Sequence, residues 1–267
     1  MKIGIVGLGK MGEAIVQGLR HSKEPSQFAL QATTKSKESA EEVSKRLSLP
    51  CGTDNASLVS ASQVILLCVK PHQAEKVLSS VASHFTKQQL IISVCASITT
   101  RQLAEWSGGK AAVIRAMPNT PCLIGEGMTV LAPGQGTLPP HLETAEKIFK
   151  TIGKTAVVEE SLMDGVTGLS GCGPAYIYLI IEALSEAGVK VGLPRKTATL
   201  LAAQTLLGSA KMVLERGDHP ASLKDEVTTP AGCTIDGLMA LEEGKLRVTL
   251  IKAVLAATKR SRALGGN

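Results

Sequence analysis

Hydrophobic and polar residues follow two different patterns along the chain, and the change falls near residue 160. Before it, short runs rich in Val, Ile and Leu alternate with stretches that have apolar residues at helical spacing. This alternation is typical of an α/β fold, a mostly parallel sheet whose strands are joined by crossover helices. The predicted strands are Lys2–Val6, Phe28–Thr33, Val64–Val69, Leu90–Val94, Ala112–Ala116, Met128–Ala132 and Thr155–Val158. The predicted helices are Met11–His21, Lys37–Leu47, Gln73–Ser83, Thr99–Trp106 and His141–Thr151.

Beyond residue 160 the strand pattern is absent and every predicted element is helical. Pro194 opens one of these helices, and Gly192 and Gly217 lie just beyond helix ends, where glycine is favoured. The sequence therefore predicts two domains, residues 1–160 with the sheet and residues 161–267 all-α, with a break near Glu159–Asp164. The predicted helices are Gly173–Val191, Pro194–Arg216, Ser222–Val227, Thr234–Glu243 and Lys245–Leu264.

One predicted helix in the second half has no polar side. The segment Thr197–Ala210 is apolar or small around most of its circumference. Such a helix requires burial on more than one side, and roughly one hundred residues of helix offer few partners within one subunit. We therefore expect a second copy of the chain to cover it, in a homodimer.

Composition narrows the choice of partner and compartment. Hydrophobic residues make up 44% of the chain and charged residues 19%, which is ordinary for a globular protein. The net charge of +6 could indicate a nucleic-acid partner, but Lys and Arg are dispersed and an aromatic content of 2% leaves little to stack bases. Six cysteines stand singly, which indicates small buried apolar residues in a reducing compartment rather than disulfides or metal ligands. With no signal segment and no apolar run of membrane-spanning length, we expect a cytoplasmic protein without nucleic acid, membrane or metal.

Gly7, Gly9 and Gly12 form a GxGxxG pattern directly after the first predicted strand and before the first predicted helix. In a dinucleotide-binding fold, the first glycine makes a tight turn, the second lets the backbone approach the pyrophosphate and the third lets helix and strand pack closely. The pattern also fits a structural glycine turn, but its position predicts dinucleotide binding.

The end of the second predicted strand indicates which dinucleotide is bound. Residues 32–37 read Ala-Thr-Thr-Lys-Ser-Lys, with no Asp or Glu. Proteins that prefer NADH usually carry an acid here for the ribose 2′-hydroxyl. Hydroxyls with a cation suit a 2′-phosphate, so we predict NADPH as the cofactor, with NADH possible. An ordinary strand-to-helix loop is the alternative interpretation of this segment.

A second candidate site lies near the end of the chain. Thr, Pro and Gly gather in Thr228–Thr234, just before a predicted helix. Orphan amides and the positive end of a helix dipole make such a turn suitable for a carboxylate. The alternative is a plain helix cap provided by Thr234.

These segments together resemble the pyrroline-5-carboxylate reductase family, which catalyses the last step of proline biosynthesis. The resemblance extends over essentially the whole chain and is carried by Val6–Gly12, Val69–Pro71, Met117–Pro121, Gly168–Tyr176 and Leu223–Ile235, of which the last two are specific to the family. It implies a Rossmann-like N-terminal domain, an all-α C-terminal dimerisation domain and a homodimer that often assembles further into a decamer. Cys172 stands where the family usually has Ser. Ala231 and Cys233 replace the commoner Gly and Thr or Ala, changes that affect fine geometry only.

The resemblance also assigns candidate site residues. Lys70 keeps the alternative of a solvated cleft residue, and Glu160 that of a solvated acid at the domain junction. Matching cofactor positions are Val6, Gly7, Leu8, Gly9, Lys10, Met11, Thr33, Lys35, Asn55, Cys68, Val69, Lys70, Pro71, Val94, Cys95 and Ala96. Matching substrate positions are Glu160, Glu226, Thr229, Gly232, Cys233 and Thr234.

The implied substrate is pyrroline-5-carboxylate, a five-membered cyclic imine with one carboxylate, which hydride from NADPH reduces to L-proline. A protonated imine is already an electrophile, so the protein mainly positions the two reactants. We expect the Thr234 hydroxyl, as the catalytic group, to bond the ring nitrogen and to donate or relay its proton, and the Gly232–Thr234 amides to hold the carboxylate.

Two other functions share some of these sequence features. The β-hydroxyacid dehydrogenases share the opening motif and carry a catalytic lysine in a GxxGxGxxxK pattern. This chain has the glycines Gly168, Gly171 and Gly173, but Ile177 stands at the lysine position, which removes the acid–base group. A non-enzymatic NADPH sensor remains the other possibility, and an assay of NADPH oxidation with pyrroline-5-carboxylate separates the three.

Overall fold

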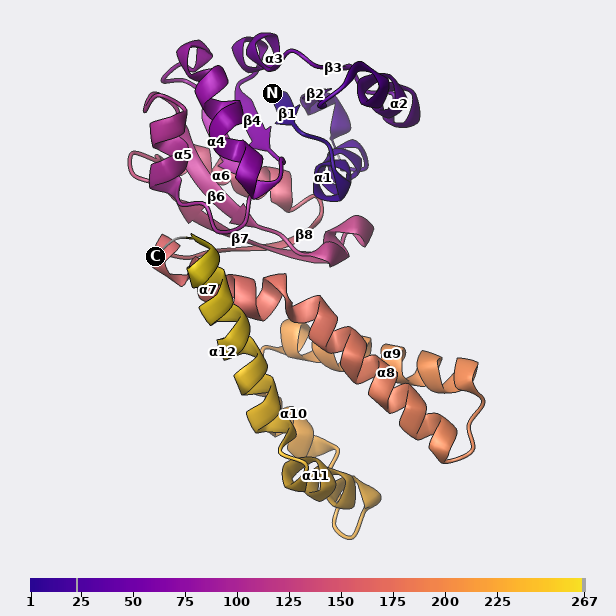
Figure 1. Ribbon diagram of the computed structural model, residues 1–267. Coiled ribbons are helices and arrows are strands. Elements are labelled where there is room, and N and C mark those ends of the chain that lie inside the picture. Colours follow the sequence, from indigo (N-terminus) through magenta and orange to yellow (C-terminus); the bar gives the residue numbers. More distant parts are fainter. Residues whose placement is uncertain (23, 266–267) are drawn as a thin grey trace. The chain divides into compact units, whose positions relative to one another are not determined.

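A computed structural model describes residues 1–22 and 24–265 (Figure 1). The chain divides into two compact units. The first, here called the sheet unit, contains Met1–Cys172 together with the C-terminal residues from Ala256 onward. The second, here called the helical unit, contains Gly173–Leu255. This division follows compactness alone, and the domain boundary at residue 160 stays a prediction.

The sheet unit is built around one eight-stranded sheet with the strand order β3-β2-β1-β4-β5-β6-β7-β8. Neighbouring strands are parallel except β6 and β7, which are antiparallel. The predicted mostly parallel α/β fold is therefore confirmed. The strands are β1 (Lys2–Val6), β2 (Ala29–Thr33), β3 (Cys51–Gly52), β4 (Val64–Leu67), β5 (Leu90–Ser93), β6 (Ala112–Met117), β7 (Gly127–Pro133) and β8 (Gly153–Val157). The helices are α1 (Lys10–Arg20), α2 (Lys37–Leu47), α3 (Asn55–Ala61), α4 (Pro71–Ser80), α5 (Thr100–Trp106), α6 (Pro139–Phe149) and the short α7 (Met163–Val166).

Helices cover both faces of the sheet, which explains why its central strands are continuously apolar. Leu66 of β4 and Ile92 of β5 face one core, which they share with α1, α2 and α6. Ile65 and Ile91, one position earlier on the same strands, face a second core with α3, α4 and α5. All four of these side chains are fully buried. Strand order reverses between β1 and β4, and such a switch point leaves a crevice at the carboxyl ends of the strands.

Strand β3 and the helices α3 and α7 of the sheet unit were not predicted from the sequence. Strand β3 has only two residues, too few for any alternation to show. Helix α3 has seven residues, and its start carries a recognisable signal, because the Asp54 side chain caps it by accepting from the backbone N–H groups of Ala56 and Ser57.

The helical unit contains α8 (Gly173–Lys190), α9 (Arg195–Arg216), α10 (Pro220–Glu226), α11 (Cys233–Glu243) and the first half of α12 (Leu246–Gly265). Helices α8 and α9 lie side by side (Figure 1). They approach closely at Gly188, where an added Cβ would stand 2.6 Å from the Cβ of Ala198. The predicted all-helical second half is confirmed.

Large apolar side chains of α8 and α9 are exposed within this chain. Leu179 is 65% exposed, and Leu200 and Leu214 are 66% and 62% exposed. Among the described residues, α9 is also the one helix long and apolar enough to cross a membrane by length and composition, with 11% of its apolar window buried. Thr, Gln, Ser and Lys residues interrupt its apolar residues, so the sequence has no continuous apolar run of that length here, but the Ala and Leu residues keep the mean hydropathy of α9 high.

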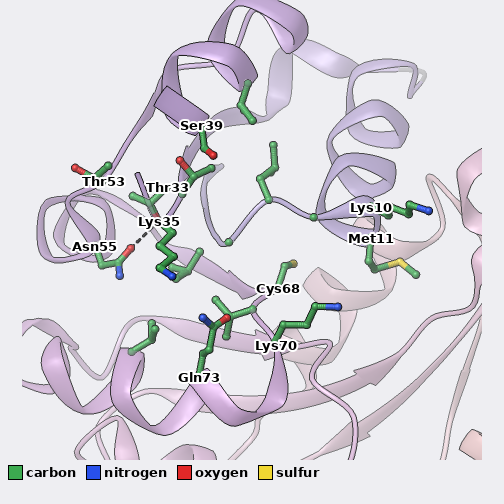
Figure 2. A pocket seen from close by; sticks show the side chains of 18 of the residues that line it. Lys10, Met11, Thr33, Lys35, Ser39, Thr53, Asn55, Cys68, Lys70 and Gln73 are labelled. Atoms are coloured by element: carbon green, nitrogen blue, oxygen red, sulfur yellow. Dashed lines mark hydrogen bonds between the residues drawn. The ribbon is translucent and has the colours of Figure 1, made fainter. Parts of the chain in front are cut away.

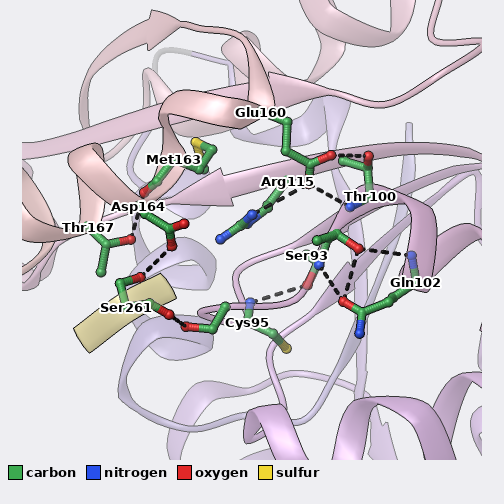
Figure 3. Close-up of polar contacts among 12 residues, drawn as sticks. Ser93, Cys95, Thr100, Gln102, Arg115, Glu160, Met163, Asp164, Thr167 and Ser261 are labelled. Atoms are coloured by element: carbon green, nitrogen blue, oxygen red, sulfur yellow. Dashed lines mark hydrogen bonds and ion pairs between the residues drawn. The ribbon is translucent and has the colours of Figure 1, made fainter. Parts of the chain in front are cut away.

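The C-terminal end of α12 packs within the sheet unit. The Ser261 hydroxyl donates a 2.6 Å hydrogen bond to the Asp164 carboxylate, and the Ser97 hydroxyl donates to the Ser261 carbonyl at 3.4 Å (Figure 3). Ser97 has a φ of 60°, an uncommon backbone conformation for a residue other than glycine.

Candidate functional site

A cavity of about 900 Å³ opens at the carboxyl ends of β1, β2 and β4, where the strand order reverses (Figure 2). Among the predicted cofactor residues, Pro71, Cys95 and Ala96 do not line it. The predicted residues that do line it are Val6, Gly7, Leu8, Gly9, Lys10, Met11, Thr33, Lys35, Asn55, Cys68, Val69, Lys70 and Val94. The structure thus brings most of these separate segments to one cavity.

The glycine loop between β1 and α1 forms one wall. Gly7 has a φ of 82°, and a Cβ there would stand 2.7 Å from Cγ1 of Val69. Around Gly9 an added Cβ would meet no described atom within 4 Å, so space is open above the backbone. Gly9 caps α1 without a side-chain hydrogen bond, which leaves the first amides of the helix for a ligand. This arrangement suits a pyrophosphate at the helix N-terminus.

The end of β2 forms the opposite wall. The Thr33 hydroxyl donates a 2.6 Å hydrogen bond to Oδ1 of Asn55, the first residue of α3 (Figure 2). Thr34 and Lys35 also line the cavity, and neither residue at this strand end is an acid. Hydroxyls and a cation therefore gather where an NADH-preferring protein would present a carboxylate.

Several lining residues were missed from sequence. Ser39, Glu42, Val43 and Arg46 come from one face of α2, and Gln73 and Val77 come from α4. The signal was available in the case of α2, because these four positions follow the i, i+3, i+4, i+7 spacing of a single helix face. Such spacing does not reveal whether the face meets a core or a ligand.

Two cysteines at the crevice have neutral thiols. Burial raises the pKa of the Cys68 thiol, and the nearby Cys95 thiol adds to the effect. Burial also raises the pKa of Cys95, which is a fully enclosed residue whose Sγ lies 3.3 Å from the Val69 carbonyl. The prediction of small buried residues is confirmed for Cys95 and Cys122, whereas Cys51, Cys68 and Cys172 are half-buried. It is wrong for Cys233, which is exposed at the start of α11.

Glu160 is not a solvated acid. Its carboxylate accepts hydrogen bonds from the Thr100 backbone N–H at 2.6 Å and from the Thr100 hydroxyl at 2.5 Å (Figure 3). The Nη1 atom of Arg115 lies 3.4 Å from the same carboxylate. Arg115 is 4% exposed, and its Nε and Nη2 atoms have no hydrogen-bond partner among the described residues. Glu160 therefore holds the N-terminus of α5 and supplies the nearest counter-charge for a buried guanidinium.

Glu226 is also held by an arginine. Arg216, at the end of α9, donates to both carboxylate oxygens of Glu226, at 2.8 and 2.7 Å. The Asp218 carboxylate lies 2.6 Å from the same guanidinium. The Arg216 hydrogen bonds lower the pKa of Glu226, so this carboxylate is ionised at neutral pH. Arg216 was missed because the pairing depends on how α9 and α10 meet.

The turn before α11 has the geometry of an open helix N-terminus. The Gly232 N–H donates to the Thr229 carbonyl at 3.0 Å, and Gly232 itself caps α11 without a side-chain hydrogen bond. Thr234 is the second residue of the helix, so the alternative of a cap provided by Thr234 is wrong. Its half-buried hydroxyl bonds no other described residue. Hydroxyl and amides are therefore both available to a ligand.

Ala231 in this turn has a φ of 58°, a left-handed conformation that glycine adopts without strain. The expectation that alanine in place of the commoner glycine affects fine geometry only does not account for this backbone strain. Among residues 1–22 and 24–265, no group of three or more His, Cys, Asp or Glu side chains could hold a metal ion.

Two family models match separate parts of the chain, and known proteins match nearly all of it. A model for pyrroline-5-carboxylate reductase dimerisation matches residues 160–264. A model for NADP oxidoreductases, coenzyme F420-dependent, matches residues 2–97. A pyrroline-5-carboxylate reductase of Methanosarcina acetivorans is 41% identical over 266 residues, covering 99% of this chain and 98% of the relative.

Solved structures give the same result. A pyrroline-5-carboxylate reductase from Coxiella burnetii has a TM-score of 0.92 and 35% identity, covering 98% of this chain and 97% of the other. A Plasmodium falciparum pyrroline carboxylate reductase with NADP bound has a TM-score of 0.85 and 34% identity, covering 99% and 98%.

Proposed function

The chain belongs to the pyrroline-5-carboxylate reductase family, and we propose from this premise how its residues reduce 1-pyrroline-5-carboxylate to L-proline with NAD(P)H. The observation that carries the proposal is that the chain has both a glycine loop with open space at the start of α1 and an open, hydroxyl-bearing helix N-terminus at Gly232–Thr234. The test is NADPH oxidation by the purified protein with pyrroline-5-carboxylate. A folded protein that binds NADPH but oxidises none with this substrate would instead be a sensor.

NADPH is proposed as the preferred cofactor. The end of β2 presents Thr33, Thr34 and Lys35 to the cavity, which suits a 2′-phosphate better than a bare ribose hydroxyl. Turnover at low cofactor concentration should be faster with NADPH than with NADH. A clear preference for NADH would refute this assignment.

The bound dinucleotide supplies the hydride, and the protein supplies positioning and electrostatics. We assign the pyrophosphate to the amides of Gly9–Met11 at the start of α1, where the helix dipole favours an anion. The Thr234 hydroxyl donates a hydrogen bond to the lone pair of the unprotonated imine nitrogen and relays a proton from solvent to it as hydride adds to the adjacent carbon. The Gly232–Thr234 amides hold the carboxylate. Thr229 and Cys233 border the same turn.

Glu160 and Glu226 complete the proposed substrate side. Each carboxylate already has fixed partners, Thr100 and Arg115 for Glu160 and Arg216 for Glu226. These partners fix the orientation of both carboxylates. Their remaining oxygen lone pairs are free to accept a hydrogen bond from the ring nitrogen of the substrate once it is protonated, or from the ammonium group of proline.

The apolar faces of α8 and α9 are proposed to pack against a second copy in a cytoplasmic homodimer, which could assemble further into a decamer. Supporting this, the dimerisation model spans these helices and their leucines are exposed in one chain. Light scattering in detergent-free buffer should give a dimer mass or a multiple of it. A detergent-dependent monomer would favour membrane association of α9 instead.

A further inference from the structure

Helix α2 forms one wall of the cavity, and this wall has a positively and a negatively charged side chain. Ser39, Glu42, Val43 and Arg46 lie along one face of the helix and line the cavity (Figure 2 labels Ser39). A carboxylate on the wall of a site for a phosphorylated cofactor repels the ligand. The negative charge of Glu42 therefore needs a neighbouring cation if a phosphorylated cofactor is to bind here.

Arg46 is placed to do so. Its Nη1 and Nη2 atoms lie 2.6 and 2.7 Å from the two carboxylate oxygens of Glu13, in the first turn of α1. The pKa of Arg46 is raised first by this hydrogen-bonded pair and also by Glu42. One guanidinium thus faces two carboxylates, Glu13 beside the glycine loop and Glu42 on the cavity wall.

Stability does not account for this arrangement. The Arg46 side chain is 45% exposed and that of Glu13 is 22% exposed. An ion pair this exposed contributes little to folding. Its position beside the glycine loop and the α2 wall points to cofactor binding instead.

We propose that Arg46 determines the preference for the phosphorylated cofactor by neutralising Glu13 and Glu42, so that the α2 wall tolerates a 2′-phosphate. The proposal rests on the assignment of NADPH to this cavity. Loss of Arg46 leaves two unpaired carboxylates, which repel the 2′-phosphate of NADPH in addition to the charges that both cofactors share. Selectivity, and not only affinity, should therefore change.

The test measures dissociation constants of NADPH and NADH by nucleotide fluorescence in the full-length protein, without substrate. We expect R46Q to weaken NADPH binding about five- to tenfold and NADH binding by a smaller factor, about two- to threefold, because the pyrophosphate that both cofactors share is assigned to the start of α1, beside Glu13. E13Q and E42Q should leave NADPH binding equal or tighter, and R46Q/E13Q should recover most of the loss. R46K, which keeps the charge, should stay close to the wild type.

R101Q is the matched control, because Arg101 forms an exposed pair with Glu105 on α5, at 3.9 Å and away from the cavity. It should change neither constant. Equal weakening of both cofactors by R46Q, or no change, overturns the proposal. A double variant as weak as R46Q also overturns it, since that result means direct contact rather than neutralisation. Failure of the reductase assignment is distinguishable from failure of this proposal, because the protein would then bind the cofactor normally but show no turnover with pyrroline-5-carboxylate.

Discussion

The Gly232 amide and the Thr229 carbonyl, 3.0 Å apart, close the turn that precedes α11. A Cβ on residue 232 would stand 2.5 Å from the Thr229 hydroxyl and 3.1 Å from its carbonyl oxygen. Residue 231 carries a Cβ where the backbone is left-handed, with a φ of 58°. The two neighbouring positions therefore respond in opposite ways to substitution.

Ala231→Gly should stabilise the protein. Removing the Cβ relieves left-handed strain of about 1–2 kcal/mol, and the greater freedom of glycine in the unfolded chain offsets part of this. We expect a net gain of roughly 0.5–1 kcal/mol in the free energy of unfolding, measured by urea denaturation. Gly232→Ala is the contrasting variant and should lower both stability and catalytic efficiency. A231G that is less stable than the wild type would contradict the strain argument.

Thr234→Ala tests the proposed proton donor. Loss of one positioned donor to the ring nitrogen should lower kcat/KM for pyrroline-5-carboxylate about 100-fold. NADPH binding should remain within a factor of about two, because the hydroxyl is assigned to the imine and not to the nucleotide. Thr234→Ser keeps the hydroxyl and should recover most of the activity. Unchanged turnover in T234A would remove Thr234 from the mechanism.

The Glu13–Arg46 pair makes a small, pH-dependent contribution to stability. The Arg46 hydrogen bonds lower the pKa of Glu13 in the folded protein. The resulting stabilisation is present above the unfolded pKa, near 4.3, and is lost as the pH falls through the folded value. Because both groups are partly exposed, the difference in stability between wild type and R46Q should be small at pH 7. Chemical denaturation at pH 7 and pH 3 measures it, and a larger difference at pH 3 would contradict this sign.

The regular part of the fold could be predicted because it depends on local pattern. Buried strands such as β4 are continuously apolar, and glycine spacing with flanking elements located the loop at Gly7–Gly12. The capping of α11 could not be decided locally, since both Gly232 and Thr234 are favourable cap residues and tertiary structure selects between them.

Polar contacts between residues far apart in the sequence were the part of the site that the sequence did not reveal. Arg46 and Glu13 are 33 residues apart, and Thr100 and Glu160 are 60 apart. Neither separation has a periodicity that indicates contact, because each pair depends on how two helices or a helix and a loop meet. Resemblance to a family identified Glu160 and Glu226 as site positions, but not the arginines that hold them.

Thiol chemistry should distinguish Cys68 from Cys233. Burial raises the pKa of Cys68, so its reactive thiolate form is scarce at pH 8 even though the residue lines the cavity. Iodoacetamide at pH 8 should therefore label the exposed Cys233 and leave Cys68 unmodified, as read by peptide mass spectrometry. C233A is the control that removes the labelled position. Rapid labelling of Cys68 in the folded protein would show that its thiol is not shielded as described.

Glu160 should contribute to stability as well as to the proposed site. Its carboxylate is the nearest counter-charge to Arg115, and their side chains are 29% and 5% exposed. Removing one partner leaves the guanidinium buried and uncompensated, so E160A should lower the free energy of unfolding by roughly 2–4 kcal/mol. E160A/R115M replaces both partners and should recover at least half of that loss, because no unpaired charge is then buried. Urea denaturation of the wild type and the two variants gives the comparison. A variant E160A that loses activity while keeping wild-type stability would mean that Glu160 acts on the substrate alone.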